Sequence, residues 1–377
     1  MNPATTSSLI ARFTRRLGLL ALACTTTLAH AQAGADLPRS TVETISVNPA
    51  QRTQIQQFVD NWAPRVTTAN AQENKRAVEA LTQPLQSQGV SVAFRQTYAQ
   101  LLKGLLDQLG SSDSISAKLS ELRLSSELAT PTAVARILKH MNDADAGVRL
   151  FAISRAGHVF ETTRVHGPAM TGNDINTLIN AIAEAGAKNA NQPEITRACA
   201  RSLAQGAMLG SKDLGDARSR AIIALSDLVG ERLQALTPND DPAFAQSLAL
   251  DAASATTRAI SDISATVTPE AARAAIRLGG DIISVPLRRL LAKTLEEQTK
   301  RDVTVRSVQA GETLLYFARR KAAELAGTSL SEIVTTQFSK QLESGDDRAF
   351  RNDAAALLGP GSPVVRESNV KSDRFLR

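Results

Sequence analysis

The stretch NDADAGVRLFAISRAGH, residues 142–158, shows most clearly how the chain is built. A polar turn with two aspartates and a glycine runs into Val-Arg and then into an apolar segment with helical spacing. We expect Asp143 or Asp145 to cap the helix that follows, because a carboxylate accepts hydrogen bonds from the free N–H groups of a first helical turn. Arg149 lies four residues after Asp145 and is interpreted as a bridging residue.

The same spacing recurs further along the chain at a period of about 48 residues. Arg149, Ala152 and Ala156 align with Arg197, Ala200 and Ala204, and another step reaches Ala245, Leu248 and Ala252. Each copy follows a polar turn, and its small residues would let the second helix of a pair approach its neighbours closely. The spacing therefore predicts a two-helix unit that repeats along the chain, with the alanines as packing positions.

Most of the remaining chain consists of amphipathic segments separated by short turns, without a run of alternating strand residues. Thr-Pro at 130–131 and at 268–269 is typical of a helix start, and Gly327 of a helix end. Gly279-Gly280 and Pro286 predict a break or kink within residues 268–295. Aromatic residues make up only 3% of the sequence, which also disfavours a strand-built core. We expect an all-α fold, an irregular α-solenoid of antiparallel helical pairs, with a multi-helix bundle as the alternative.

The segment Asp143–Gly157 resembles the second helix of the HEAT/armadillo class of helical repeats, in which an Asp-containing turn precedes Val-Arg and alanines at helical spacing. Glu194–Gly206 is a weaker match. The third copy has Ala245 where the arginine would be, so it departs from a continuous Asp–Arg ladder. The resemblance implies an extended surface that binds protein or peptide partners.

Residues 1–31 are typical of an export signal, with a basic region, a short apolar run and Ala-His-Ala before the cleavage point. The apolar run is shorter than the ~20 residues that span a bilayer, so we expect no transmembrane helix in the mature chain. The sequence ALAC at 21–24 is similar to a lipobox, which leaves a lipid anchor at Cys24 as an alternative. The protein is therefore expected to be exported, periplasmic or secreted, and in the alternative a lipoprotein.

The mature chain is expected to comprise a polar leader at 32–47, a helical repeat domain at 48–357 and a disordered Gly/Pro/Ser-punctuated tail at 358–377. Without the first 31 residues, 40 basic side chains stand against 37 acidic ones, so the net charge falls from +6 to +3. This balance gives no reason to expect a nucleic-acid partner. Cys199 would be the only remaining cysteine, and its alanine neighbours predict a buried thiol.

No catalytic, phosphate-binding or metal-binding motif is recognisable, and no cofactor is expected. The DADAG turn is not a calcium loop, because Val148 and Ser154 stand where such a loop needs Gly and Glu. His158 and Glu161 share a helix face, but no second pair completes a metal site. We therefore expect a non-catalytic scaffold that binds protein or peptide partners in the cell envelope.

Two alternatives remain open. Residues 303–327 are similar to the start of a LysM module, since Gly311, Glu312, Thr313 and Leu314 match its Gly-Asp/Glu-Thr-Leu core. That resemblance implies an opening strand before the core and a peptidoglycan-binding accessory. The other alternative is a helical enzyme that acts on envelope polysaccharide, which would need two carboxylates to converge in a cleft.

Overall fold

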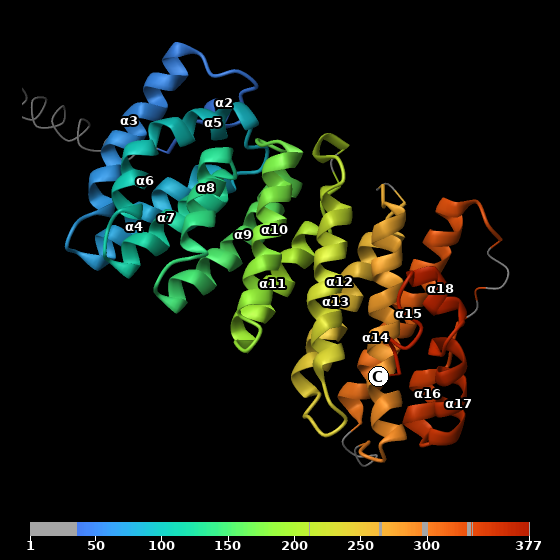
Figure 1. The fold of residues 1–377 in the computed structure, drawn as a ribbon. Coiled ribbons are helices and arrows are strands. Elements are labelled where there is room, and N and C mark those ends of the chain that lie inside the picture. Colours follow the sequence, from blue (N-terminus) through green and yellow to red (C-terminus); the bar gives the residue numbers. More distant parts are fainter. Residues whose placement is uncertain are drawn as a thin grey trace, which may run out of the picture. The chain divides into compact units, whose positions relative to one another are not determined.

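The computed structural model describes residues 36–210, 212–263, 266–295, 301–329, 333 and 335–376. Every regular element in these ranges is a helix, which confirms the all-α prediction (Figure 1). None of the described helices has the length and apolar character that crossing a membrane requires. The export signal at 1–31 and the lipid anchor at Cys24 lie outside the described residues.

The chain divides into two compact units, which end and begin at Leu109 and Gly110. The helical region predicted over 48–357 thus spans parts of both units. The first unit contains α2 (Arg39–Val42), α3 (Pro49–Val66), α4 (Ala71–Thr82), η1 (Gln83–Gln86), α5 (Val92–Leu101) and most of α6 (Lys103–Gly110). Its core gathers apolar and aromatic side chains from α3, α4 and α5, among them Ile55, Phe58, Leu81, Phe94 and Tyr98.

The described part of the expected polar leader, residues 36–47, belongs to the first unit. Helix α2 forms within it, and the Val42 side chain is buried. The Val42 carbonyl accepts a hydrogen bond of 3.0 Å from the Ser91 backbone N–H. A single apolar residue in a polar stretch is a weak signal, so the sequence pattern did not reveal this contact.

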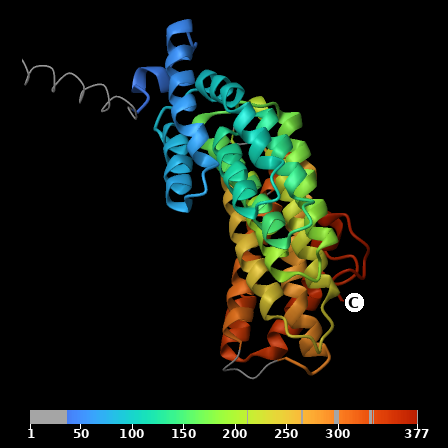
Figure 2. The same cartoon turned by 90° about the vertical axis from the view of Figure 1, so that its left-hand side faces the viewer.

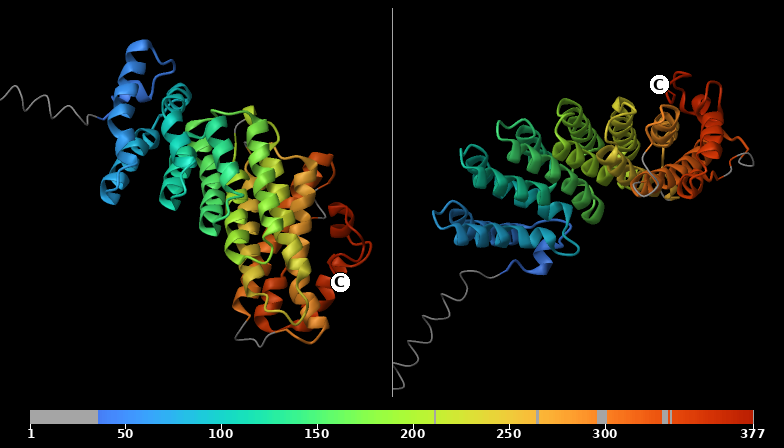
Figure 3. Two further views of the ribbon diagram at one scale, coloured as in Figure 1. Left: turned by 60° about the vertical axis from the view of Figure 1, so that its left-hand side comes forward. Right: turned by 90° about the horizontal axis from the view of Figure 1, so that it is seen from below.

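The second unit contains the remaining helices, which follow one another in chain order (Figure 3). They are α7 (Ile115–Leu128), α8 (Pro131–His140), α9 (Ala146–His166), α10 (Gly172–Lys188), α11 (Pro193–Gly206), η2 (Lys212–Leu214), α12 (Ala217–Ala235), α13 (Ala243–Ser261), α14 (Pro269–Leu291), α15 (Asp302–Ala326), α16 (Phe338–Ser344), α17 (Asp347–Leu358) and α18 (Pro363–Ser368). Two series pack side by side: α7, α9, α11, α13 and α15 form one, and α8, α10, α12 and α14 form the other. This arrangement is compatible with a helical-repeat fold.

The helix boundaries follow the capping signals of the sequence. The Asp145 carboxylate accepts from the Val148 backbone N–H at 2.9 Å and so caps α9. The Thr268 hydroxyl likewise accepts from the Ala271 N–H at the start of α14. Gly327 ends α15 in the left-handed conformation, with φ of 64°. These three predictions are confirmed.

The break expected at Gly279-Gly280 and Pro286 does not occur, because α14 runs without interruption from Pro269 to Leu291. The two glycines instead allow neighbouring side chains to approach α14 closely. A β-carbon on Gly279 would lie 3.1 Å from Cβ of Leu315 in α15, and one on Gly280 would lie 2.7 Å from the Phe375 ring. Helix α14 thus uses the two positions to accept α15 and the C-terminal segment.

The LysM resemblance of residues 303–327 implies an opening strand, and that structural prediction is wrong. Residues 303–310, where that module has its opening strand, are the first turns of α15. Gly311 packs against Ile282 of α14, where a β-carbon would lie 2.8 Å from the Ile282 side chain. The Glu312 carboxylate accepts from the backbone N–H groups of Phe338 (2.6 Å) and Ser339 (3.0 Å) at the start of α16. The motif residues therefore join α15 to its neighbouring helices.

The tail expected to be disordered at 358–377 is ordered as far as residue 376. The Ser362 hydroxyl caps α18 by accepting from the Val365 N–H at 3.3 Å. Beyond α18 the chain lies on the surface of the second unit, shown in red in Figure 2. The Phe375 side chain there is 0% exposed. Glycine, proline and serine form turns and caps in this segment instead of preventing order.

Cys199 lies in α11 and is completely buried, as its apolar neighbours predicted. Burial raises the pKa of its thiol to about 12, so the reactive thiolate is not formed at neutral pH. The side chain packs near Gly186 of α10 and Leu228 of α12. It is a packing residue where three helices meet.

Candidate functional site

The turn before α9 is held by its two aspartates in different ways. Asp145 caps the helix, whereas the Asp143 carboxylate accepts from Lys118 Nζ at 2.9 Å and from the Asp145 backbone N–H at 3.0 Å. The hydrogen bond from Lys118 is the largest reason that the pKa of Asp143 falls to about 2. Arg149 donates to the Asp143 and Ala144 carbonyls at 2.8 and 2.9 Å, so it closes the turn of its own helix pair. The structure does not place it as a bridge to another pair.

The other predicted repeat positions lie where α9, α11 and α13 pack together. Ala152, Ala156 and Ala200 are buried, and Ala204 is half-buried. The Arg197 guanidinium lies 5.2 Å from the centre of the Phe244 ring in α13, so this arginine, unlike Arg149, reaches the following pair. The repeat positions are therefore packing and turn residues, and they do not assemble into a binding site.

A buried cluster of charged residues joins α7 to α8. The Glu121 carboxylate accepts from Arg136 Nη1 at 2.9 Å and lies 2.6 Å from His140 Nε2, and His140 Nδ1 lies 3.3 Å from Asp143 Oδ2. Glu121 and His140 are each only 1% exposed. A carboxylate–histidine pair can transfer protons, but no substrate can reach this one. Its evident effect is to hold the two helices together.

His158 lies at the edge of a hollow between α9 and α11, with a volume of about 520 Å³. Its Nε2 is 3.1 Å from a Glu127 carboxylate oxygen and its Nδ1 is 3.2 Å from one of Glu161. The hydrogen bond with Glu127 raises the pKa of His158. Among the described residues, no group of three or more histidines, cysteines and carboxylates is placed to hold a metal ion.

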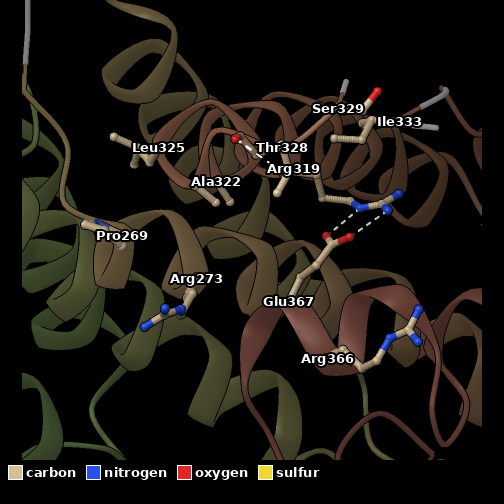
Figure 4. A pocket seen from close by; sticks show the side chains of 12 residues that line it. Pro269, Arg273, Arg319, Ala322, Leu325, Thr328, Ser329, Ile333, Arg366 and Glu367 are labelled. Carbon is tan, nitrogen blue, oxygen red and sulfur yellow. Dashed lines mark hydrogen bonds and ion pairs between the residues drawn. The ribbon is translucent and has the colours of Figure 1, made fainter. Parts of the chain in front are cut away.

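A second hollow of about 560 Å³ lies between the start of α14, the end of α15 and α18 (Figure 4). Arg319 donates to both carboxylate oxygens of Glu367, at 2.7 and 2.8 Å, so its charge is neutralised inside the hollow. The Arg273 and Arg366 side chains point away from that pair and from each other in Figure 4. The arginines do not converge on one point, as recognition of a single anion would require.

The third hollow is a groove of about 600 Å³ between α10 and α12, which extends to the first residues of α14. Its floor is apolar and consists of Ala183, Ala187, Ile223, Ala224 and Leu228. Its rim carries five carboxylates, from Glu184, Asp216, Asp227, Glu231 and Glu270. Arg220 supplies the one cationic side chain in the lining, and further basic side chains lie beside it, among them Arg273, which is 3.5 Å from Glu270.

Most of the rim carboxylates are oriented by a basic neighbour on their own or the next helix. Lys188 Nζ lies 2.7 Å from Glu184 and lowers its pKa, and Arg220 Nε lies 2.9 Å from Asp216. Asp227 pairs with Arg277 of α14. These pairs are exposed, so each holds a side chain in place with little gain in stability. Glu231 makes no ion pair within the described part of the chain.

The C-terminal segment contacts residues of both α12 and α14. Arg374 donates to both carboxylate oxygens of Asp281, at 3.1 and 2.7 Å, and Gln234 Nε2 donates to the same carboxylate at 2.7 Å. Asp281 is 0% exposed, and burial raises its pKa while Arg374 opposes that effect. Phe375 covers Gly280 beside it.

The groove residues were not among those that the sequence singled out. They come from elements that are distant in the sequence. Asp216, for example, accepts a hydrogen bond of 3.2 Å from Nδ2 of Asn176, which is 40 positions earlier in the chain. An acidic helix face beside an alanine stripe is the only signal that α10 and α12 offer, and many solvated helices share it. Comparison with known proteins adds no further guide: no family model matches the chain, and no characterised protein matches it significantly in sequence.

Proposed function

We propose that the protein is an exported, non-catalytic helical-repeat scaffold that binds protein or peptide partners in the cell envelope. The observation that carries this proposal is the groove between α10 and α12, with its apolar floor and its charged rim. A peptide gains affinity by burying apolar side chains on such a floor, and the rim selects among peptides by charge.

The repeat architecture supports the same proposal. Successive helices of the second unit pack in two series, and hollows lie between α9 and α11 of one series and between α10 and α12 of the other. Surfaces of this kind are extended and made of rigid elements, which suits the recognition of long segments. The capped turn at Asp145 and the buried Ala152 and Ala156 support kinship with HEAT-like repeats, which we propose on this basis.

Chemistry on polysaccharide finds less support in the same groove. A general acid for glycoside cleavage needs a carboxyl group whose pKa is raised. The pKa of Glu184 is instead lowered, chiefly by the hydrogen bond from Lys188. The carboxylate whose pKa is raised, Asp281, is buried beneath Arg374 and does not line the groove.

Export is proposed from the sequence of residues 1–31 alone. Expression of the full chain in a bacterium, followed by mass determination of the product from the envelope fraction, tests it. We expect a chain that begins at Gln32, whereas a lipid-modified chain that begins at Cys24 would favour the lipoprotein alternative. An unprocessed chain in the cytoplasm would contradict export.

The binding function is tested by affinity capture from the envelope of the source cells with the mature chain and with Ala187→Trp. Ala187 is an exposed residue of the groove, so a tryptophan there occupies the floor without entering the core. Ala71→Trp, at an exposed position in α4 of the first unit, is the matched control. We expect a partner that the mature chain and the Ala71 variant retain and the Ala187 variant loses. Equal recovery by all three proteins, or recovery by none, would contradict the proposal.

A further inference from the structure

The hollow between α9 and α11 is lined by three arginines that have no acidic partner. Arg155 belongs to α9, and Arg197 and Arg201 belong to α11. Within the described part of the chain, none of these three guanidinium groups forms an ion pair or donates a hydrogen bond. Other arginines of the second unit do have such partners, as Arg218 has in Asp262. The hollow therefore keeps three guanidinium groups available to an anion from outside.

Arg155 is the most enclosed of the three. Its Nε atom is buried and lacks a hydrogen-bond partner. Burial lowers the pKa of this arginine, Arg123 of α7 adds to that effect, and Glu127 opposes it. A cation that is partly removed from water costs free energy unless an anion or a hydrogen-bond acceptor replaces the water. An anion that binds the Nη atoms of Arg155 would supply that replacement.

Aromatic rings hold two of the arginines in place. The Cζ atom of Arg155 lies 4.6 Å from the centre of the Phe151 ring, and that of Arg197 lies 5.2 Å from the centre of the Phe244 ring. A ring face attracts a cation without accepting its N–H groups in the way that a carboxylate does. These guanidinium groups are therefore positioned before a ligand arrives while their donors stay free, which lowers the cost of binding.

The carboxylates around the hollow do not neutralise the arginines. Glu161 and Glu194 are the acidic residues of the lining. His158 lies 3.2 Å from Glu161 and 3.1 Å from Glu127, so two of the neighbouring carboxylates face this histidine. Within the described residues Glu194 forms no ion pair. One unpaired carboxylate thus stands against three unpaired arginines, and the hollow is cationic.

The spacing of the arginines on α11 indicates the form of the anion. Arg197 and Arg201 are four residues apart, so they lie about 6 Å apart along the helix axis on one face. In an extended segment, alternate side chains share a face and are separated by about 6.6–6.8 Å. Two acidic side chains at alternate positions can therefore each meet one arginine of α11. Ser154 and Gln205 add polar side chains to the lining for the backbone of such a segment.

We infer that the hollow between α9 and α11 binds a partner segment in which aspartate or glutamate stands at alternate positions. The site goes beyond the proposed function, because it lies on the other helix series and accepts a ligand of defined charge. The occupant is a segment of another protein. Residues 1–31 of this chain contain no aspartate or glutamate, so they do not supply it.

Fluorescence anisotropy with the mature chain and labelled synthetic peptides tests the inference. One probe of about ten residues alternates Glu and Ser, and a second of equal length alternates Lys and Ser. At low salt we expect the Glu-Ser probe to bind at least about tenfold more tightly, and the difference to shrink as added salt shortens the Debye length. Equal affinity for the two probes, a preference for the Lys-Ser probe, or a preference that salt does not change would overturn the inference.

Charge-removing variants then locate the binding. Arg197→Gln combined with Arg201→Gln removes both arginines of α11, and we expect the Glu-Ser probe to bind about three- to tenfold more weakly. The matched control is Arg348→Gln with Arg351→Gln, which removes two exposed arginines one turn apart on α17. An equal loss of affinity in the two double variants would show general attraction by a basic protein and overturn the assignment to the hollow.

Arg155→Leu separates binding from folding. Leucine keeps an apolar contact with Phe151 and removes a charge that has no partner, so we expect the midpoint of urea unfolding to be no lower than that of the wild type. The Glu-Ser probe should nevertheless bind about three- to tenfold more weakly. An unchanged affinity for the probe would show that Arg155 takes no part and would overturn the site as described.

Failure of this site and failure of the proposed function are distinguishable. If Ala187→Trp abolishes capture of an envelope partner while the Glu-Ser probe binds no better than the Lys-Ser probe, the inference is overturned alone. If the Glu-Ser probe is preferred and Arg197→Gln with Arg201→Gln removes that preference, the inference stands whatever is captured from the envelope.

Discussion

Helix α12 packs against α10 on one side and α14 on the other, and the two junctions differ in what covers them. Toward α14, Gly230 faces a buried carboxylate, and the chain's own C-terminal arginine and phenylalanine cover the junction. Toward α10, Gly186 faces a leucine, and the groove stays open with carboxylates on its rim. A buried charge must be paired within the molecule, whereas a buried leucine needs no such partner, so the shallow hollow beside Leu228 can stay open. The difference separates a structural contact from a candidate binding surface.

Of the changes that test this comparison, Arg374→Ala is expected to lower the free energy of unfolding the most. The substitution leaves the Asp281 carboxylate buried without its cation, which costs about 3–5 kcal/mol when a buried pair is broken. Urea unfolding followed by far-UV circular dichroism measures the loss. Trp62, the one tryptophan, lies in the first unit, so its fluorescence serves as an internal reference that should not change. Asp281→Asn in the same protein should recover most of the stability. A loss below about 1 kcal/mol would mean that the C-terminal segment contributes little to the second unit.

Gly230→Ala is expected to cause the next largest loss of stability. The new β-carbon would lie 2.6 Å from Asp281 Oδ2, and that carboxylate is held in place by Arg374 and Gln234. Because the obstacle is not free to move, we expect a loss of about 1–3 kcal/mol, as for overpacked cores. The same unfolding measurement applies. An unchanged midpoint would show that the carboxylate has room to shift, contrary to the packing described above.

The pH dependence of the Arg374→Ala variant gives a smaller effect with a defined sign. Burial raises the folded-state pKa of Asp281 above its ordinary value of 3.8, and loss of Arg374 removes the main opposing influence. A group with a raised folded-state pKa contributes its full stability below the unfolded pKa and loses it as the pH rises through the folded pKa. The variant should therefore be closer to the wild type in stability near pH 4 than at pH 7. A gap that widens on acidification would contradict this account of the buried carboxylate.

The smallest effect is expected in the open groove, from Gly186→Ala. Its β-carbon would lie 2.8 Å from the Leu228 Cδ1 atom, which is the far end of a flexible, largely buried side chain that borders the groove. The leucine can rotate, and alanine favours the helix by about 1 kcal/mol over glycine, so the two effects should nearly cancel. A loss as large as that of Gly230→Ala would show that both junctions are equally rigid and would break the comparison.

The sequence allowed the helices to be predicted better than the contacts between them. Capping signals are local, so Asp145, Thr268 and Gly327 could be assigned from their neighbours alone. The glycine pair at 279–280 was misread as a break, because a glycine that ends a helix and one that admits a neighbouring helix look alike in a sequence. Only the positions of Leu315 and Phe375 in space distinguish the two.

The C-terminal segment and the grooves illustrate the same limit. The composition of residues 358–377 is that of a disordered tail, and its order depends on partners for Arg374 and Phe375 that lie about 90 positions away. The rim of the open groove combines α10, α12 and the start of α14, so no local window contains it. Arg149 was expected to bridge repeats because of its spacing, yet the nearest acceptors are the carbonyls of its own turn.

The rate at which the buried thiol of Cys199 is alkylated can report how often the surrounding helices separate. A thiol with a pKa near 12 at the junction of α10, α11 and α12 is not alkylated while these helices stay together. Labelling in water therefore proceeds only through molecules in which the helices have separated, and its rate reports how often that happens, in the manner of amide hydrogen exchange. Since the open groove is formed by two of the three helices, a bound partner should slow labelling in proportion to its occupancy.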